Sequence, residues 1–215
     1  MRKTPFVSGN FYHIYNRGVD KRNVFIDQND LNRFFQSMIE FNSVEPIGSI
    51  YENSFRKNLE SGLGYPMSKL VNFIAYCLNP NHYHFVLEPV KDNGIEKFMQ
   101  RLGNGYTKYF NNKNNRSGSL FQGNFKSIHI STNEYLLKVS AYVNLNNRVH
   151  SLGHLMSKSS WNEYVSKFGG FCKKDIILEQ FGSGDEYRKF CEGTIIDIVE
   201  GRKLNEEVRG LFLES

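Results

Sequence analysis

The sequence predicts an α+β protein in which helices cover an antiparallel sheet, and three observations lead to this prediction. A strand-like run at residues 9–17 precedes an amphipathic stretch at residues 27–42. Two apolar runs, at 71–78 and 82–88, are joined by an Asn-Pro-Asn turn at 79–81 and therefore indicate a central hairpin. A helix, a strand and a further helix follow, an alternation that is typical of this fold class.

The N-terminal elements follow from their periodicities. The run at 9–17 alternates and stops at Gly18, so His13 and Arg17 share one strand face. In the 27–42 helix Asp30 near the start favours the helix dipole, and apolar side chains recur at helical spacing at Leu31, Phe34, Phe35, Met38, Ile39 and Phe41. Residues 43–69 show no convincing period and contain prolines and glycines, so we expect a loop or insertion there.

The central hairpin contains the most informative pair of residues. Side chains alternate along a strand, so His82 and His84 share one face with Val86, while Tyr83 and Phe85 share the other. Neutral imidazole is the commonest protein ligand for metals. The two histidines could therefore bind a metal ion, or they could be hydrogen-bonded side chains in a half-buried sheet. Their spacing alone leaves both options open.

The second half of the chain continues the pattern with a helix at 94–111 and a strand at 125–130. A further helix is expected to open with a capping box between Ser131 and Glu134 and to run to about Asn147. Its core face is predicted at Leu136, Val139 and Val143.

Tyr142 lies beside this core face, and Asn146 is its i+4 neighbour, so their side chains should project together from one helix. Tyr135 is seven residues earlier on nearly the same side, and we expect it to pack. The chain is divided into a domain at 1–150 and a small helical C-terminal appendage at 151–215. Short helical pieces are expected in the appendage at 161–168, 175–181, 185–191 and 204–213.

Charge and composition indicate the class of partner. The net charge is +5, and no acidic residue occurs between Lys97 and Lys126. Basic, aromatic and asparagine side chains alternate in that segment, as a nucleic-acid surface requires. The alternative is a solvated helix face followed by a basic loop. We favour phosphate binding for the basic positions, and the expected DNA-binding residues are Arg17, Lys108, Lys113, Arg116 and Lys126.

Other classes of protein are disfavoured. No apolar run approaches the roughly 20 residues that span a bilayer, and no signal peptide follows the basic N-terminus. The three cysteines are far apart and lack CxxC spacing. We therefore expect a cytoplasmic protein without a membrane partner, a disulfide framework or a cysteine-based zinc site.

Three segments taken together resemble a known family. They are His82-Tyr83-His84, the basic segment at 118–126 and the Tyr142-Val143-Asn144-Leu145-Asn146 run. In this order they resemble the HUH-type single-tyrosine transposases, and most closely the REP-associated tyrosine transposases and related insertion-sequence proteins. The opening segment at 12–18 matches as well, and the resemblance covers roughly residues 8–150.

The resemblance implies a ferredoxin-like sheet, a divalent metal (Mg²⁺ or Mn²⁺) held by His82, His84 and Asn146, and Tyr142 as the nucleophile. It also implies single-stranded or hairpin DNA as the substrate, a 5′-phosphotyrosine intermediate, and a homodimer as one option. Two histidine ligands favour Mn²⁺, because Mg²⁺ prefers oxygen. The family commonly has proline after the amide residue, whereas Asn147 follows here.

Two other functions fit the residues. A hydrolase could use His82, His84 and a third ligand such as His13 to hold Zn²⁺ and activate water. A catalytically silent module could bind single-stranded nucleic acid on the sheet without cutting it.

Overall fold

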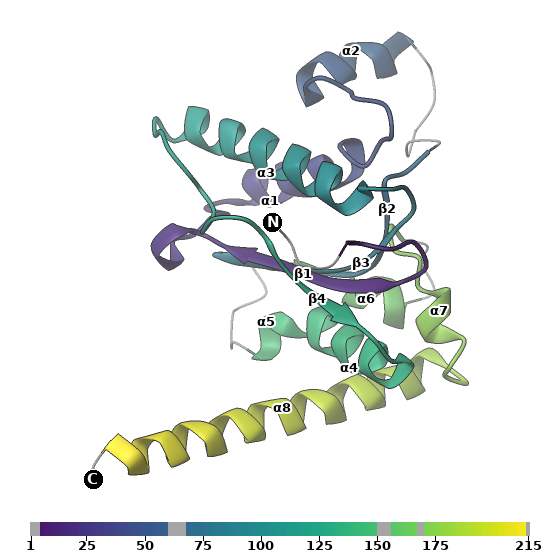
Figure 1. Ribbon diagram of the computed structural model, residues 1–215, viewed down its shortest axis with the longest axis vertical. Coiled ribbons are helices and arrows are strands. Elements are labelled where there is room, and N and C mark those ends of the chain that lie inside the picture. The colour runs from purple at the N-terminus through teal and green to yellow at the C-terminus, as the bar shows by residue number, and fades with distance from the viewer. Residues whose placement is uncertain (1–4, 60–67, 150–155, 167–169, 214–215) are drawn as a thin grey trace.

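The computed structural model describes residues 5–59, 68–149, 156–166 and 170–213 (Figure 1). Five strands form one sheet in the order β4-β1-β3-β2-β5, and all neighbours are antiparallel. Its first four strands have the order of a ferredoxin-like sheet, which confirms the predicted fold class. The strands are β1 Phe11–Arg17, β2 Val71–Asn79, β3 His82–Pro89, β4 Lys126–Ile130 and β5 Lys158–Ser159.

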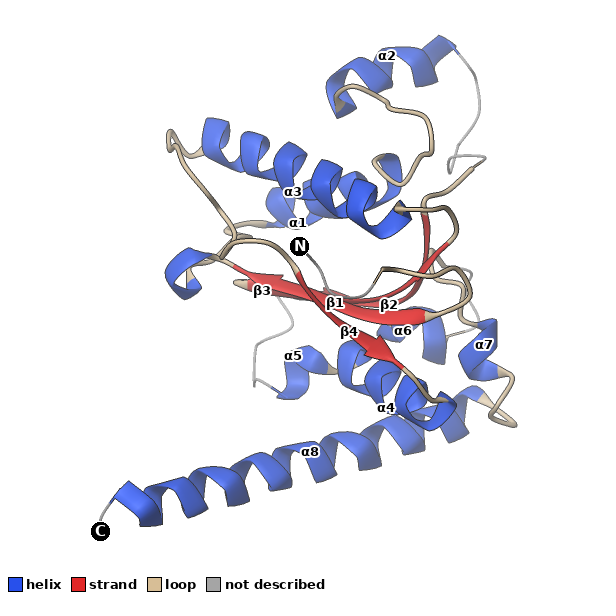
Figure 2. Ribbon diagram, in the orientation of Figure 1, coloured by secondary structure: helices blue, strands red, loops and turns tan. Residues whose placement is uncertain are grey.

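Helices cover both faces of the sheet (Figure 2). One face carries α1 (Gln28–Glu40) and α3 (Gly94–Lys113), and a short 3₁₀ turn at Val19–Lys21 follows β1. The opposite face carries α4 (Asn133–Asn144), α5 (Asn146–Val149), α6 (Trp161–Val165), α7 (Asp175–Leu178) and α8 (Gly184–Leu213). No helix in the described part of the chain is long and apolar enough to cross a membrane.

Alternation along the strands builds one hydrophobic core on each face. Tyr83, Phe85 and Leu87 of β3 pack in the cluster under α1 and α3. Val86, which shares its face with the histidines, packs with α4 residues in the second cluster. The expected core face of α4 is confirmed, because Leu136, Val139 and Val143 are all buried there. The histidine face of β3 is therefore directed toward α4.

The segment at 43–69 is not the plain loop that was expected. It contains the helix α2 (Ile50–Leu59), while residues 60–67 lie outside the described residues. The Ser49 hydroxyl accepts a hydrogen bond from the Glu52 backbone at 3.1 Å, and the Glu52 carboxylate accepts one from the Ser49 backbone at 2.8 Å. This reciprocal pair starts the helix, and the prolines and glycines that argued against it lie on either side.

The base of this segment is closed tightly. The buried Asn42 side chain accepts from the Leu70 and Val71 backbone nitrogens at 3.1 and 2.9 Å and donates to the Val71 carbonyl at 2.9 Å. Ser43 and Lys69 form an isolated bridge just beyond it. The end of α1 is thereby fixed to the start of β2.

The helix α4 differs from expectation at both ends. Its N-cap is Thr132, whose hydroxyl accepts from the Tyr135 backbone at 3.2 Å, so the predicted Ser131 capping box is wrong by one residue. Glu134 instead pairs with Lys138 at 2.7 Å. The helix ends at Asn144, because Leu145 leaves the helical region with φ −112° and ψ 17°, and α5 begins at Asn146.

The C-terminal region is also more continuous than predicted. The two separate pieces expected at 185–191 and 204–213 belong to the single 30-residue helix α8. Tyr187 and Cys191 of this helix are buried in the cluster that contains the α4 residues. The Tyr187 hydroxyl accepts from the Asn144 amide at 2.8 Å, which fixes the end of α4 against α8.

Candidate metal and DNA-binding site

Three strands bring the candidate residues into one row on the α4 face. In the register of β1 with β3, Tyr15 is opposite His84 and Arg17 is opposite His82. In the register of β1 with β4, Lys126 is opposite Tyr15. Opposed residues of an antiparallel pair project to the same face. His82 therefore lies beside the basic Arg17, while His84 lies beside Tyr15, which has Lys126 on its other side.

His82 is held from both sides of its ring. Its Nδ1 lies 2.6 Å from the Asn81 carboxamide oxygen, which can only accept, so Nδ1 carries the proton. Its Nε2 lies 3.0 Å from Asn79 Nδ2 and 3.0 Å from Asn146 Oδ1. Burial lowers the pKa of His82. The hydrogen bond that a protonated Nε2 would donate to Asn146 raises this pKa, and the charge of Arg17 lowers it. With the proton on Nδ1, a neutral His82 carries its lone pair on Nε2.

His84 is buried and contacts a third histidine. Its Nδ1 lies 2.8 Å from Nε2 of His13, which projects from β1. Burial lowers the pKa of His13 to about 4, so His13 is neutral near pH 7. When the Nδ1–H of His84 donates to His13, the lone pair of His84 is on Nε2, where it can bind a metal ion.

The contact between His13 and His84 disfavours His13 as a third zinc ligand, the role that the hydrolase alternative gave it. His13 Nε2 is engaged with His84 Nδ1 at 2.8 Å. No three His, Cys, Asp or Glu residues in the described ranges are placed to hold a metal ion together. His13 is better described as the residue that orients His84.

Tyr142 of α4 packs directly on this group. Its ring meets His84 edge-on with the centroids 5.5 Å apart, and it meets His13 in the same way at 6.0 Å. Tyr135, which was expected to pack, is 37% exposed instead. Of the two tyrosines, Tyr142 is the one beside the histidines.

Asn146 reaches the same place from a different helix. The prediction that Tyr142 and Asn146 project together as i+4 neighbours of one helix is wrong, because the chain leaves α4 between them. Asn146 is fully buried, and its Oδ1 accepts from Asn79 Nδ2 at 2.8 Å. Its Nδ2 has no hydrogen-bond acceptor among the described residues. A buried donor without an acceptor is costly and is typical of a site built for a ligand.

The donor atoms fit a divalent cation. Ligands about 2.1 Å from a metal and at a right angle to each other lie about 3.0 Å apart. His82 Nε2 and Asn146 Oδ1 have this separation of 3.0 Å. An imidazole nitrogen with an amide oxygen suits Mn²⁺ better than Mg²⁺. The oxygen of this pair comes from an asparagine amide and not from a carboxylate.

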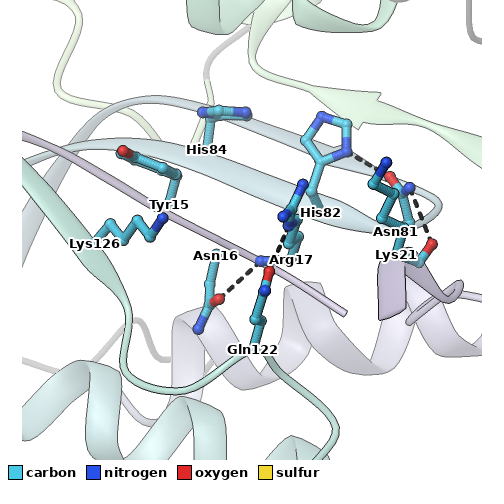
Figure 3. A pocket seen from close by; sticks show the side chains of 9 residues that line it. All are labelled: Tyr15, Asn16, Arg17, Lys21, Asn81, His82, His84, Gln122 and Lys126. Carbon is cyan, nitrogen blue, oxygen red and sulfur yellow. Dashed lines mark hydrogen bonds between the residues drawn. The ribbon is translucent and has the colours of Figure 1, made fainter. Parts of the chain in front are cut away.

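A basic cavity of about 600 Å³ opens beside His82 and His84 (Figure 3). Three cationic side chains line it and no acidic one does, namely Arg17, Lys21 and Lys126. Gln122 accepts from Arg17 Nε at 2.5 Å and orients the guanidinium. Sequence reasoning identified Arg17 and Lys126 but missed Lys21 and Gln122. The close pairing of β1 with the chain at 121–123 is the signal that the sequence did not reveal.

The other predicted DNA-binding residues lie away from this cavity. Lys113 binds Asp27 at 2.7 Å and the fully buried Asp30 at 2.6 Å, at the start of α1. Arg116 donates to Asn111 and to the Ser119 carbonyl, which shapes the loop after α3. Lys108 is exposed on α3. These contacts give Lys113 and Arg116 structural roles, and their binding to DNA stays a prediction.

Part of the sequence matches a known protein family. Residues 53–146 match the family model described as IS200-like transposase. The matched residues include both histidines, Tyr142 and Asn146. Over these residues the chain resembles the IS200-like transposase family. The resemblance to the single-tyrosine transposases is thereby confirmed.

A solved structure supports the fold of this chain. It is that of a REP-associated tyrosine transposase bound to a REP hairpin, which matches with a TM-score of 0.52 at 11% sequence identity. The match covers 78% of this chain and 86% of the other. No curated protein matches the sequence.

Proposed function

We propose that the chain is a metal-dependent enzyme that nicks single-stranded DNA and transfers the cut strand through a covalent intermediate on Tyr142. The observation that supports this most strongly is the convergence of Tyr142, His84 and the pair His82 and Asn146, at the edge of a cavity lined only by basic charges. A transposase of this family requires a nucleophile, a metal site and a phosphate-binding surface, and these residues offer candidates for all three.

Tyr142 and a bound cation would have different roles in the reaction. The Tyr142 hydroxyl loses its proton and its oxygen attacks phosphorus, so that a 5′-phosphotyrosine forms. The bond from phosphorus to the 3′-oxygen breaks, and the leaving 3′-oxygen takes up a proton to become a free 3′-hydroxyl. Tyrosine has an ordinary pKa of about 10, so positioning contributes more here than intrinsic reactivity. A bound divalent cation would polarise a non-bridging phosphate oxygen. Attack by a 3′-hydroxyl on the phosphotyrosine reverses the step and joins strands without an external energy source.

The protein residues hold the parts in place. His82 and Asn146 present lone pairs at 3.0 Å, and His13 fixes the ring of His84. Arg17 and Lys126 line the cavity together with His82 and His84 and would bind the phosphates on either side of the scissile bond. The basic cavity suits an unpaired strand, and we infer that the substrate is single-stranded DNA or the base of a hairpin. A homodimer remains a further prediction.

The test compares two tyrosines on one helix. Wild type, Tyr142→Phe and Tyr135→Phe are incubated with hairpin-bearing single-stranded DNA and Mn²⁺, and the covalent adduct is measured by denaturing electrophoresis. We expect wild type and Tyr135→Phe to form the adduct and a folded Tyr142→Phe to form none. EDTA should abolish the adduct in wild type and in Tyr135→Phe.

Two results would overturn the proposal. An adduct with Tyr142→Phe would place the nucleophile elsewhere. Tight, metal-independent DNA binding by wild type with no adduct would leave the chain as a silent binding module, for which the basic cavity would be sufficient.

A further inference from the structure

The remaining polar residue at the centre of the site is Asn79, the last residue of β2. It is fully buried, and it pairs with His82 in the register of the central hairpin. Its Nδ2 lies 2.8 Å from Asn146 Oδ1 and 3.0 Å from His82 Nε2. One amide group therefore bridges the two atoms that would hold the cation.

The three atoms form a triangle of a particular size. Its sides are 2.8 Å from Asn79 to Asn146, 3.0 Å from Asn79 to His82 and 3.0 Å from His82 to Asn146. Three ligands on one face of an octahedron, each about 2.1 Å from the metal, are separated by about 3.0 Å. The triangle is thus the size of one face of an octahedral coordination sphere.

The other atom of the Asn79 amide has partners that permit it to turn over. Its Oδ1 accepts from Ser157 Oγ at 3.1 Å and lies 3.6 Å from Cys77 Sγ. A hydroxyl and a thiol can each donate or accept. After a half-turn of the amide, Nδ2 would donate to Ser157, and Oδ1 would enter the triangle. The turn exchanges one set of hydrogen bonds for another.

The present orientation has a clear reason in the metal-free protein. His82 Nε2 and Asn146 Oδ1 are both acceptors, and two lone pairs at 3.0 Å need a positive group between or beside them. The NH₂ of Asn79 supplies that group by donating toward both. A cation would take over this role and would leave the NH₂ in an unfavourable place.

Building on the metal site of the proposed function, we propose that Asn79 is a further ligand of the divalent cation. Its amide turns over when the metal binds and gives Oδ1 to the same face as His82 and Asn146. Without the metal, the NH₂ of Asn79 stands in for the cation. The end of β2 thus contributes to the site together with β3 and α5.

The test measures Mn²⁺ binding by calorimetry in the absence of DNA. Asn79→Asp removes the NH₂ and offers only charged oxygen, so affinity should rise about tenfold or more if the oxygen binds the metal. Asn79→Ala should lower it about tenfold, as loss of a metal-site residue commonly does. If the NH₂ were needed only to hold Asn146, Asn79→Asp would repel Asn146 Oδ1 and weaken binding. Weaker or unchanged binding by a folded Asn79→Asp overturns the inference.

Two controls separate the possible failures. Asn81→Asp adds the same charge on the Nδ1 side of His82, outside the triangle, and an equal rise there would attribute the effect to charge alone. His82→Ala should remove binding. If it does not, the proposed metal site itself is wrong, whereas loss with His82→Ala and no response at Asn79 would reject only the role of Asn79.

A second measurement applies to the wild-type chain if Asn79→Asp does not fold. In crystals grown with Mn²⁺, the anomalous signal locates the ion. We expect the Asn79 oxygen about 2.2 Å from it, within ordinary first-row metal–oxygen distances. An ion bound by His82 and Asn146 with the Asn79 amide beyond 3 Å would overturn the inference.

Discussion

Replacing Lys113 by methionine should destabilise the fold, because the ammonium neutralises a carboxylate that water cannot reach. Asp30 is fully buried, and Lys113 Nζ lies 2.6 Å from its Oδ1. Removing one partner of a buried pair typically costs about 3–5 kcal/mol. Asp30 retains hydrogen bonds from the Ile26 backbone at 2.8 Å and the Tyr109 hydroxyl at 3.2 Å, and the lysine side chain is 30% exposed. We therefore expect a loss of about 2 kcal/mol, below that range.

Urea unfolding at pH 7, followed by circular dichroism, measures this loss. Lys108→Met is the matched control, because Lys108 is exposed on the same helix and should change the free energy of unfolding by less than about 0.5 kcal/mol. Adding Asp30→Asn to Lys113→Met should recover part of the loss, since the uncompensated charge disappears. Equal stability of the two lysine variants would refute the argument that Lys113 acts through Asp30.

Three further predictions concern the cavity, the pH dependence and the packing of α3. Arg17→Ala combined with Lys126→Ala should reduce the slope of log affinity for single-stranded DNA against log salt by about 1.4, and an unchanged slope would place the DNA elsewhere. The pKa of His13 is lowered from 6.5 to about 4, so on acidification the unfolded chain binds this proton before the folded chain does. The free energy of unfolding should therefore be retained above pH 6.5 and fall by about 3 kcal/mol on going to pH 4. Urea titration at each pH measures this fall, which should be smaller in His13→Gln. Gly94→Ala should lower the melting temperature, because the added Cβ would lie 2.3 Å from the Leu70 carbonyl oxygen. Gly103→Ala should raise the melting temperature slightly, because its Cβ would meet nothing within 4 Å. The reverse order of the two melting temperatures would contradict this packing.

The sheet could be predicted because its signals are local. Strand alternation at 82–88 set the faces of β3, and the structure places His82 and His84 on one face with Val86. The Asn-Pro-Asn turn fixed the hairpin, whose strands end at Asn79 and begin at His82. Periodicity of two residues and turn chemistry act within a few residues, so no tertiary contact was needed to read them.

What the sequence did not reveal depends on distant contacts. Glycines at 193, 201 and 210 suggested breaks, but each costs only about 1 kcal/mol in a helix and α8 continues through them. The N-cap of α4 is Thr132 and not Ser131. Serine and threonine are both favoured at this position, so the sequence alone does not distinguish two adjacent hydroxyl residues.

The site shows the same division between local and distant contacts. The paired histidines were visible in the sequence, while the contact of His13 with His84 joins residues 71 positions apart. Lys113 looked like a phosphate ligand because its carboxylate partners, Asp27 and Asp30, lie 86 and 83 positions earlier. Contacts between residues so far apart in the sequence leave no local pattern, and this is also true of the contact between Asn79 and Asn146.

The closure below α2 has an evolutionary consequence. Asn42 joins the end of α1 to the start of β2, and the Val44 backbone nitrogen donates to the Ser68 carbonyl at 3.1 Å. The segment between Val44 and Ser68 thus leaves the fold and returns to it at nearly one point, on the α1 side of the sheet and remote from His82 and His84. Doubling the length of a flexible loop with fixed ends costs only about 0.6 kcal/mol. Insertions and deletions between these ends are therefore tolerable, and related chains can differ widely in length here while keeping the same sheet.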